Sequence, residues 1–410
     1  MEYFVHTLPN GIRILAVPAA SSISHACVIV NAGSRDEPQG KDGLAHFIEH
    51  LLFKRTAKRN TSQILNRLES VGADLNAYTT KEYTCVHASF LQPYLDRSLE
   101  LFQDILFQSV FPEDEMEKEK NVILDEIASY RDQPEEAIND DFEDLLFAGH
   151  SLGRNILGTT DTVPQLNRQD IHSFITENYR TDQIVVAILG NYKAAKVFKL
   201  GEKYFGEVRE KTTGRDRNPP QQQPAVQLTE EKPIFQSHVL LGKASYSIHH
   251  PHKTGLLLLN NLLGGNGMSS ILNLQIRERH GIAYTIESGY VPLSDTGLFS
   301  IYFGTDKEKV PRTLQLVYRE FKKLRDNGLN ELQLQRAKHK LIGQIALGEE
   351  NRIGLIISMA KSLCDHGYVD SLDVVFAKIE AVSRSQIHDI IMETLDEREL
   401  SSLTFSPAPE

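Results

Sequence analysis

Apolar positions recur along the chain with the two spacings that are typical of helices and strands. In one stretch they return every three or four residues, at Leu95, Leu99, Phe102 and Leu106. This spacing lines one face of an amphipathic helix. The charged stretches 112–130 and 330–348 predict two further helices. Short apolar runs at 84–90 ("TCVHASF") and 298–304 ("LFSIYFG") predict strands. Helices and strands therefore alternate along the chain.

The two halves of the chain carry the same succession of features. An I-L-N triplet at 64–66 precedes an A-Y-T triplet at 77–79, and a second such pair stands at 271–273 and 283–285. A strand-like run and two helices follow in each half. This many ordered matches indicate that one fold has been duplicated. We predict an α+β protein of two homologous halves, each a mixed or antiparallel sheet with helices packed on one face.

Residues 209–233 lie between these halves and show no apolar period. The segment "REKTTGRDRNPPQQQPAVQLTEEKP" is charged at its start and then rich in Pro and Gln, which is typical of an interdomain linker. At 410 residues, the chain is also too long for one ordinary hydrophobic core. We therefore predict domains at 1–208 and 234–410, joined by 209–233.

The charge and the cysteines narrow the class of protein. A formal net charge of −11 argues against nucleic-acid partners, whose phosphates need a basic face. No window reaches the roughly eighteen apolar residues of a membrane helix, and no signal peptide is visible at the start. The three cysteines are far apart and predict no disulfide framework. We expect a cytoplasmic protein; a periplasmic one would require a leader removed from this sequence.

The stretch "GLAHFIEHLLF" (43–53) carries the most specific chemistry. His46 and His50 are four residues apart on a predicted helix, so both imidazoles project from one face with Glu49 beside them. Zinc suits imidazole ligands, and a catalytic zinc site needs three protein ligands and one open position. Glu49 could then take a proton from water at the metal. The order H-x-x-E-H is an inverted form of the zinc-protease motif H-E-x-x-H.

The second half of the chain has the same helix without this chemistry. Alignment of the repeats places His46, Glu49 and His50 opposite Leu258, Asn261 and Leu262. Since the second copy of the fold lacks these polar groups, the fold does not require them. This weakens the interpretation of the motif as a purely structural feature.

A third metal ligand is predicted on the helix at 112–130. Glu119 and Glu126 are seven residues apart, or two turns, so their carboxylates share one stripe. Val122 is on that stripe with Ile123 and Ile127 beside it, which predicts that the stripe faces packed structure. A buried carboxylate is costly unless it is paired or bound to a metal. We predict Glu126 as the third ligand and Glu119 as a carboxylate that supports a ligand.

The two carboxylates also have no counterparts in the second half. The alignment places Glu119 and Glu126 opposite Ala337 and Gln344. All the predicted metal chemistry therefore belongs to the first half.

These features together resemble the pitrilysin family of inverted-motif zinc metallopeptidases, and within it the branch of the mitochondrial processing peptidase and its small bacterial relatives. The resemblance covers nearly the whole chain, through "LPNGIRILAVP", "AGSRDEP", "HFIEHLLF", "NAYTTKEYT", "GRNILGT", "LGGNGMSSILNLQIRERHGIAY" and "SLDVVFAKIEAVS". It implies one Zn²⁺ per chain held by His46, His50 and Glu126, with Glu49 as the base and Glu119 in a supporting role.

The resemblance implies further site residues. Arg277 and Tyr284 match an Arg and a Tyr that, in the family, grip the substrate and steady the oxyanion. The strand Asn76, Ala77, Tyr78 and Thr79 matches an edge to which peptide substrates add as an extra strand. The family architecture also implies a dimer. Because this chain carries both the zinc residues and the Arg–Tyr pair, a homodimer is favoured over a heterodimer with a related subunit.

The sequence therefore predicts a zinc endopeptidase that cleaves short or unfolded peptides. Two alternatives remain at this point. The first is a non-catalytic peptide-binding or structural core subunit of the same fold, although such relatives usually lose the zinc ligands. The second is a zinc hydrolase of another bond class, such as an ester.

Overall fold

The chain forms two compact units that do not follow the order of the sequence strictly. The computed structural model describes residues 2–212 and 217–409, so 213–216 of the predicted linker lie outside the described residues. Unit 1 comprises Met1–Ala128, Arg154–Arg217 and Gly348–Ser371. Unit 2 comprises Ser129–Gly153, Asn218–Leu347 and Leu372–Glu410. Each unit thus contains one short segment from the other half of the chain.

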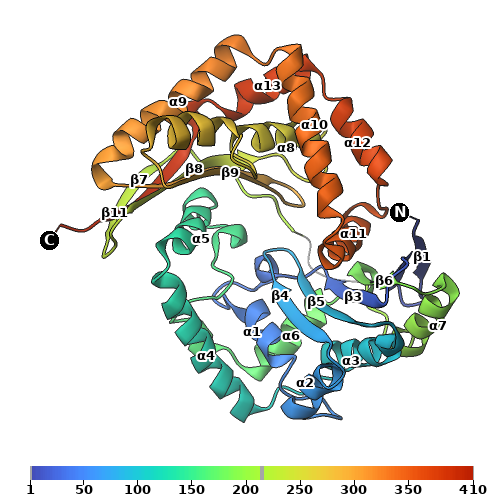
Figure 1. Cartoon of the computed structure of the whole chain (residues 1–410). Helices are drawn as coiled ribbons and strands as arrows, with labels where there is room; N and C mark the ends of the chain where they lie inside the picture. Colours follow the sequence, from blue (N-terminus) through green and yellow to red (C-terminus); the bar gives the residue numbers. More distant parts are fainter. Residues whose placement is uncertain (1, 213–216, 410) are drawn as a thin grey trace. The chain divides into compact units, whose positions relative to one another are not determined.

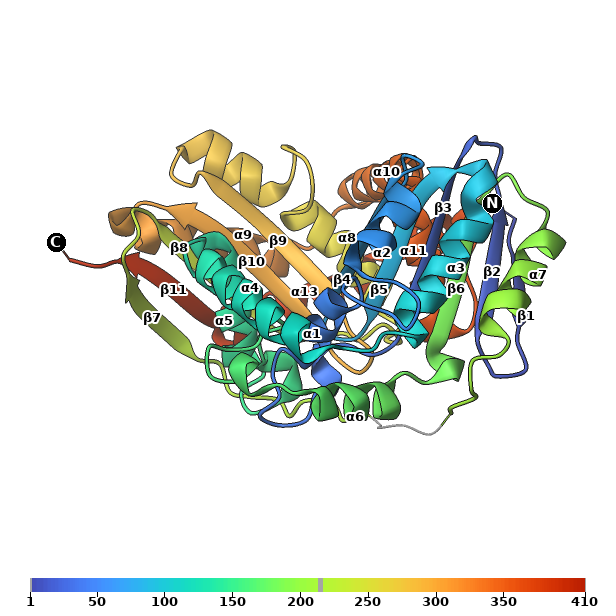
Figure 2. The same ribbon diagram turned by 90° about the horizontal axis from the view of Figure 1, so that it is seen from below.

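Unit 1 is built on a six-stranded mixed sheet (Figure 2). Its strands, in spatial order, are β1 (Phe4–Thr7), β2 (Arg13–Pro18), β6 (Ile184–Gly190), β3 (Ile23–Val30), β5 (Thr84–Leu91) and β4 (Asp74–Thr79). Only β2 and β6 run parallel; the other neighbours are antiparallel. Strand β4 forms one edge of this sheet, and this edge is next to the site described below.

One face of the unit 1 sheet packs against most of the unit's helices. They are α1 (Leu44–Leu51), α2 (Thr61–Glu69), α3 (Leu95–Phe107), α4 (Glu113–Arg131), α6 (Arg168–Asn178) and α7 (Ala194–Phe205). The side chains of β3 alternate as a strand requires: Ala26 and Val28 join this core, whereas Cys27 and Ile29 point to the opposite face. The predicted face of the 95–107 helix is buried as expected.

The opposite face of the unit 1 sheet is covered by α11 (Arg352–His366), a helix from late in the chain. Ile356, Met359 and Leu363 of α11 are buried against Cys27 and Ile29. The α+β prediction is therefore confirmed, but the second face of the sheet also carries a helix. That helix comes from the other sequence half.

Unit 2 repeats this arrangement on a five-stranded sheet (Figure 1). Its strands, in spatial order, are β7 (Gln227–Lys232), β11 (Ser401–Pro407), β8 (Ser237–Ser245), β10 (Gly297–Thr305) and β9 (Thr285–Pro292). The main helical layer consists of α8 (Lys253–Leu263), a π-helical segment (Asn273–Glu278), α9 (Val310–Asn327), α10 (Glu331–Gly348), α12 (Leu372–Glu380) and α13 (Arg384–Thr394). The other face packs against α5 (Pro134–Leu146), which comes from the first half of the chain.

The strand orders confirm the duplication. Both β2-β6-β3-β5-β4 and β7-β11-β8-β10-β9 contain one parallel pair at the same place, β2 with β6 and β7 with β11. One match used to recognise the repeat is nevertheless wrong in register. Thr79 pairs with Thr84 beside the hairpin turn, whereas Thr285 pairs with Gly304 at the far end of its hairpin. The A-Y-T triplets therefore do not occupy equivalent positions.

None of the helices in the described part of the chain is long and apolar enough to span a membrane.

Candidate metal site

The helix that carries the histidines, α1, is fixed at its start by a buried carboxylate. Glu37 accepts hydrogen bonds from the backbone N–H groups of Gly43 and Ala45, at 3.1 and 2.8 Å. These N–H groups have no partner within the helix, so the carboxylate caps them. Gly43 has a φ of 92°, and a Cβ there would lie 2.6 Å from the carbonyl oxygen of Leu157. Glycine is therefore required at this entry, and α1 begins at a defined point.

His46 and His50 lie side by side on α1, with ring centroids 4.5 Å apart. His46 is 8% exposed, and its Nδ1 has no hydrogen-bond partner among the described residues. Burial and the neighbouring His50 lower the pKa of His46 to about 3. A neutral imidazole is the form that binds a metal, and Nε2 is the nitrogen of His46 that lies near Glu126.

Glu126 on α4 approaches both histidines. Its Oε2 lies 3.8 Å from Nε2 of His46 and 3.6 Å from Nε2 of His50. One donor atom from each of the three side chains falls within 4.8 Å of the others. Ligand atoms around a tetrahedral zinc, with bonds of about 2.0–2.1 Å, are about 3.3 Å apart. Two imidazole nitrogens and one carboxylate oxygen at these separations therefore fit a zinc ion.

The stripe of α4 that holds both carboxylates is only partly buried. Glu119 is buried and Ile123 and Ile127 pack in the core, as predicted. The expectation is wrong for Val122, which is 47% exposed. Glu126, one turn further on, keeps 34% of its side chain exposed. The boundary between packed structure and solvent therefore passes through the site, as a metal with an open coordination position requires.

Glu119 joins α4 to the second histidine. Its Oε2 lies 3.1 Å from Nδ1 of His50, and its Oε1 lies 2.6 Å from Nζ of Lys54. Burial raises the pKa of Glu119, but the hydrogen bonds with His50 and Lys54 outweigh it and the net shift is downward. Burial likewise lowers the pKa of His50, and the bond to Glu119 and the charges of Glu126 and Glu49 reverse that shift. Lys54 was not predicted from the sequence, since its partner is 65 positions away.

Glu49 lies between the histidines and the edge strand β4. Burial raises the pKa of Glu49, and hydrogen bonds from the side chain and backbone amide of Thr79 oppose that rise without cancelling it. Its Oε2 is buried and has no hydrogen-bond partner among the described residues. The pKa of the buried Tyr179 hydroxyl is raised, mainly by burial and to a lesser extent by the charge of Glu49. Glu49 thus has one oxygen anchored to β4 and one available for proton transfer.

The predicted substrate strand, Asn76 to Thr79, is part of β4, the last strand of its sheet. Thr80 N–H donates to the carbonyl of Tyr83 at 2.8 Å. Because backbone groups alternate in direction along antiparallel strands, Ala77 and Thr79 direct theirs to the open edge. The N–H of Ala77 is occupied by Oδ1 of Asn76 at 2.8 Å. This edge ends at Glu49.

Arg277 and Tyr284 belong to unit 2, whereas the three candidate ligands, Glu49 and Glu119 belong to unit 1. Arg277 is exposed and lies 3.8 Å from a carboxylate oxygen of Glu278. The Tyr284 hydroxyl, also exposed, donates to Asp306 at 3.2 Å. A role of these two side chains at the metal stays a prediction from the sequence resemblance.

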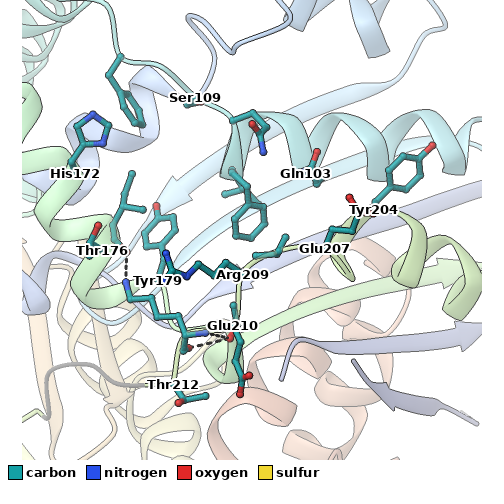
Figure 3. A pocket seen from close by; sticks show the side chains of 18 of the residues that line it. Gln103, Ser109, His172, Thr176, Tyr179, Tyr204, Glu207, Arg209, Glu210 and Thr212 are labelled. Carbon is teal, nitrogen blue, oxygen red and sulfur yellow. Dashed lines mark hydrogen bonds between the residues drawn. The ribbon is translucent and has the colours of Figure 1, made fainter. Parts of the chain in front are cut away.

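Unit 1 also contains a cavity of about 1270 Å³ that none of the predicted site residues lines (Figure 3). Figure 3 shows His172 and Thr176 on one side, Tyr204 on the other, and Tyr179 and Arg209 between them. The C-terminal ends of α3, α6 and α7 meet here, and their partial negative charge favours cations. One basic residue of the lining, Lys211, offsets the end of α6, because its ammonium donates to the carbonyl of Ile175 in the last turn at 2.8 Å.

Comparisons with known proteins find relatives over nearly the whole chain. Residues 14–160 match the family model described as insulinase (peptidase family M16), and 165–341 match the model described as peptidase M16 inactive domain. The chain is 30% identical to the uncharacterized zinc protease YmxG of Bacillus subtilis, over 96% of this chain and 95% of that protein. It is 33% identical to an uncharacterized zinc protease of Mycobacterium leprae, over 96% and 89%.

Two solved structures share the fold. A peptidase M16 inactive domain from Pseudomonas fluorescens superposes with a TM-score of 0.90 at 20% identity, over 100% of this chain and 98% of that one. A protease from Helicobacter pylori superposes with a TM-score of 0.90 at 22% identity, over 99% of both chains. From the full-length relatives and the two family models, we conclude that the chain belongs to the M16 family of zinc proteases, also called the insulinase or pitrilysin family, as its sequence resemblance predicts.

Proposed function

We propose that this protein is a zinc-dependent endopeptidase that hydrolyses short or unfolded peptides. The observation that carries the proposal is the convergence of His46, His50 and Glu126 within 4.8 Å, with Glu49 beside them. The relatives named as zinc proteases support it. One zinc ion per chain is part of the proposal.

The side chains divide the chemistry among them. His46, His50 and Glu126 would hold the ion, which when bound supplies a Lewis acid and makes water more acidic. Glu49 takes a proton from the water as its oxygen adds to the carbonyl carbon, and then delivers that proton to the nitrogen of the leaving amine, so that the C–N bond breaks and the carbonyl re-forms. The raised pKa of Glu49 suits this exchange, because a general base works best when its pKa approaches the working pH.

The edge of β4 supports the preference for extended peptides. A peptide that adds to this edge would pair with the backbone of Ala77 and with the carbonyl of Thr79, whose N–H is held by Glu49. It would also displace the side chain of Asn76 from the N–H of Ala77. Its scissile bond would then lie near Glu49, where β4 ends. Main-chain pairing of this kind demands an unfolded segment and little side-chain specificity.

The finer assignments belong to the same proposal. Arg277 and Tyr284 donate hydrogen bonds to the carbonyl oxygen that gains charge, either within one chain or from a partner subunit. A homodimer suffices for this arrangement, because one chain carries both sets of residues. The likeness to the mitochondrial processing peptidase branch is proposed on the sequence resemblance alone.

The test uses Glu49→Gln with a quenched fluorogenic peptide. We expect the variant to retain zinc, measured by elemental analysis, and to cleave about 10²–10⁴-fold more slowly than the wild type. The control is Glu69→Gln, which changes an exposed glutamate of α2 and should leave turnover unchanged. Undiminished cleavage by Glu49→Gln would refute the role of this residue. Zinc-loaded wild type that binds the peptide without cutting it would indicate a non-catalytic peptide-binding subunit, and cleavage of esters alone would indicate another class of hydrolase.

A further inference from the structure

Lys54 follows the end of α1, and its side chain pairs with Glu119, the carboxylate that contacts His50. Its Nζ lies 2.6 Å from Oε1 of Glu119, and the two side chains are 25% and 7% exposed. An ion pair with one nearly buried partner is held more firmly than the exposed pairs common on protein surfaces. Neither the motif H-x-x-E-H nor the predicted ligand set includes this lysine.

The backbone at Lys54 is fixed on both sides of the residue. Its N–H donates to the carbonyl of Leu51, in the last turn of α1, at 3.2 Å. Its own carbonyl accepts from the Thr61 hydroxyl, at the start of α2, at 2.7 Å. The aliphatic part of the side chain therefore starts from a defined position. The ammonium group can reach Glu119 without a flexible loop between them.

Each oxygen of Glu119 has a different partner. Lys54 occupies Oε1 and Nδ1 of His50 lies against Oε2. A carboxylate paired with a lysine accepts hydrogen bonds and donates none, so His50 must donate from Nδ1. The remaining nitrogen, Nε2, then carries the lone pair, and it is this atom that lies 3.6 Å from Glu126. The tautomer and the ring direction of His50 thus follow from the placement of Glu119.

We propose that Lys54 is a positioning residue of the metal site: by holding one oxygen of Glu119, it keeps the other directed at Nδ1 of His50 and Nε2 directed at the metal. The inference rests on the proposed zinc site and adds a residue to it. Lys54 itself touches neither the candidate ligands nor the substrate edge in the contacts described above.

The direction in which zinc affinity changes distinguishes a positioning role of Lys54 from an effect of its charge. Lys54 carries a positive charge near a site for a divalent cation. By Coulomb's law alone, removal of that charge should strengthen zinc binding. Positioning predicts the opposite, because a free Glu119 no longer fixes His50. A fall in zinc affinity therefore cannot come from the lost charge.

The experiment measures the zinc affinity of the metal-free protein by competition with a chromophoric chelator at fixed pH. Lys54→Met should weaken binding about 10-fold, within the 10–100-fold range of residues that orient a metal ligand. Glu119→Gln should weaken it at least as much. The double variant should bind no more weakly than Glu119→Gln alone, because both changes break the same chain of contacts. Lys54→Arg, which keeps the ion pair, should restore most of the affinity.

The matched control is Lys58→Met. Lys58 is four residues further along, exposed, and makes no ion pair with any residue the structure describes. The Lys58→Met variant should bind zinc with the affinity of the wild type. Circular dichroism of each metal-free variant establishes that it is folded. Lys54→Gln is measured as a second neutral variant. If Lys54→Met does not fold, the zinc affinity of Lys54→Gln still tests the proposal.

The outcomes separate the inference from the proposed function. Wild type that fails to bind zinc would overturn both. Wild type that binds zinc, with neutral Lys54 variants that bind equally or more tightly, would overturn the inference alone. So would additive losses in the double variant, since these would show that Lys54 acts independently of Glu119.

Discussion

The candidate metal site of unit 1 and its counterpart in unit 2 lie on the same two helices of the repeated fold but contain different side chains. In unit 1, α1 and α4 bring His46, His50 and Glu126 together. In unit 2, α8 and α10 bring together Asn261 and Gln344, the residues aligned with Glu49 and Glu126. The amide of Asn261 donates to Oε1 of Gln344 at 2.6 Å. The helices therefore meet at equivalent points in both copies.

The two copies differ in the kind of polar group that lies between these helices. In unit 2, the Asn261 amide donates to Gln344 and the Gln344 amide donates to the carbonyl of Asn266, while Oδ1 of Asn261 is buried without a partner among the described residues. In unit 1, Nδ1 of His46 and Oε2 of Glu49 are buried in the same way. Each such group costs about 1–3 kcal/mol of stability. In unit 1 the unpaired groups are an imidazole and a carboxylate, which can bind a metal or move a proton, as expected where function rather than stability selects the residues.

The largest expected effect comes from giving unit 1 the residues of unit 2. His46→Leu with His50→Leu should abolish zinc binding and lower peptide cleavage at least about 10³-fold, because the metal stabilises the transition state by several kcal/mol. Metal-free His46→Leu alone should melt at the same or a higher temperature, since a buried unpaired nitrogen is removed, whereas His50→Leu should lower the melting temperature because Oε2 of Glu119 loses its partner. Elemental analysis, turnover and calorimetry measure these three quantities. Retained zinc would show that the histidines do not hold it.

A second prediction compares α11 and α5, the two helices that pack on the sheet of the other half of the chain. Ile356→Ala on α11 should destabilise unit 1 by about 2–5 kcal/mol, and Phe142→Ala on α5 should destabilise unit 2 by about 3–5 kcal/mol, since both side chains are fully buried. Hydrogen exchange should rise in β3 and β6 for the first variant and in β8 and β11 for the second. Faster hydrogen exchange in strands of the other unit instead would contradict the packing of α11 on unit 1 and of α5 on unit 2.

A third prediction concerns the amide pair of unit 2. Gln344→Leu removes the acceptor of the Asn261 amide and should cost about 1–3 kcal/mol in urea unfolding. Zinc content should not change, because the pair lies in the copy without metal donors. Asn261→Leu combined with Gln344→Leu should recover part of the loss, since no amide is then left unpaired. A double variant as unstable as the sum of the single ones would argue against a direct pair.

The smallest expected effect is a pH dependence in unit 2. Burial lowers the pKa of His238, whose Nδ1 lies 2.8 Å from the Tyr302 hydroxyl. The unfolded chain then binds the proton more readily than the folded one. Stability should be complete above about pH 6.5 and fall as the pH drops below it. His238→Gln should flatten this part of the curve of unfolding free energy against pH for the zinc-free protein. An unchanged slope would assign the dependence to other groups.

Spacing along helices predicted much of the arrangement in unit 1. The intervals of four residues between His46 and His50, and of seven between Glu119 and Glu126, place side chains on one face wherever the helix packs. The structure brings these residues together. Lys54 and Glu37 escaped notice because their partners are distant in sequence or are backbone groups. No periodic pattern records such contacts.

The sequence also did not predict that α5 packs in unit 2 and α11 in unit 1. The apolar faces of these helices show that they are buried, but periodicity does not say against which sheet. The same limit explains Val122, an apolar residue that is exposed beside Glu126. The A-Y-T triplets failed differently: three common residues matched, while hairpin register depends on the turn.

The late position of α11 also affects the order of events during synthesis. A ribosome adds about 5–20 residues per second, and α11 ends only at His366 of 410. Until then, the outer face of the first sheet, with Leu15, Val17 and Ile29, has no cover of its own. The emerging polypeptide therefore cannot complete unit 1, with the candidate metal ligands, before residue 366 has been synthesised. Under the proposed function, this delay would keep an incomplete active site from acting on neighbouring nascent chains.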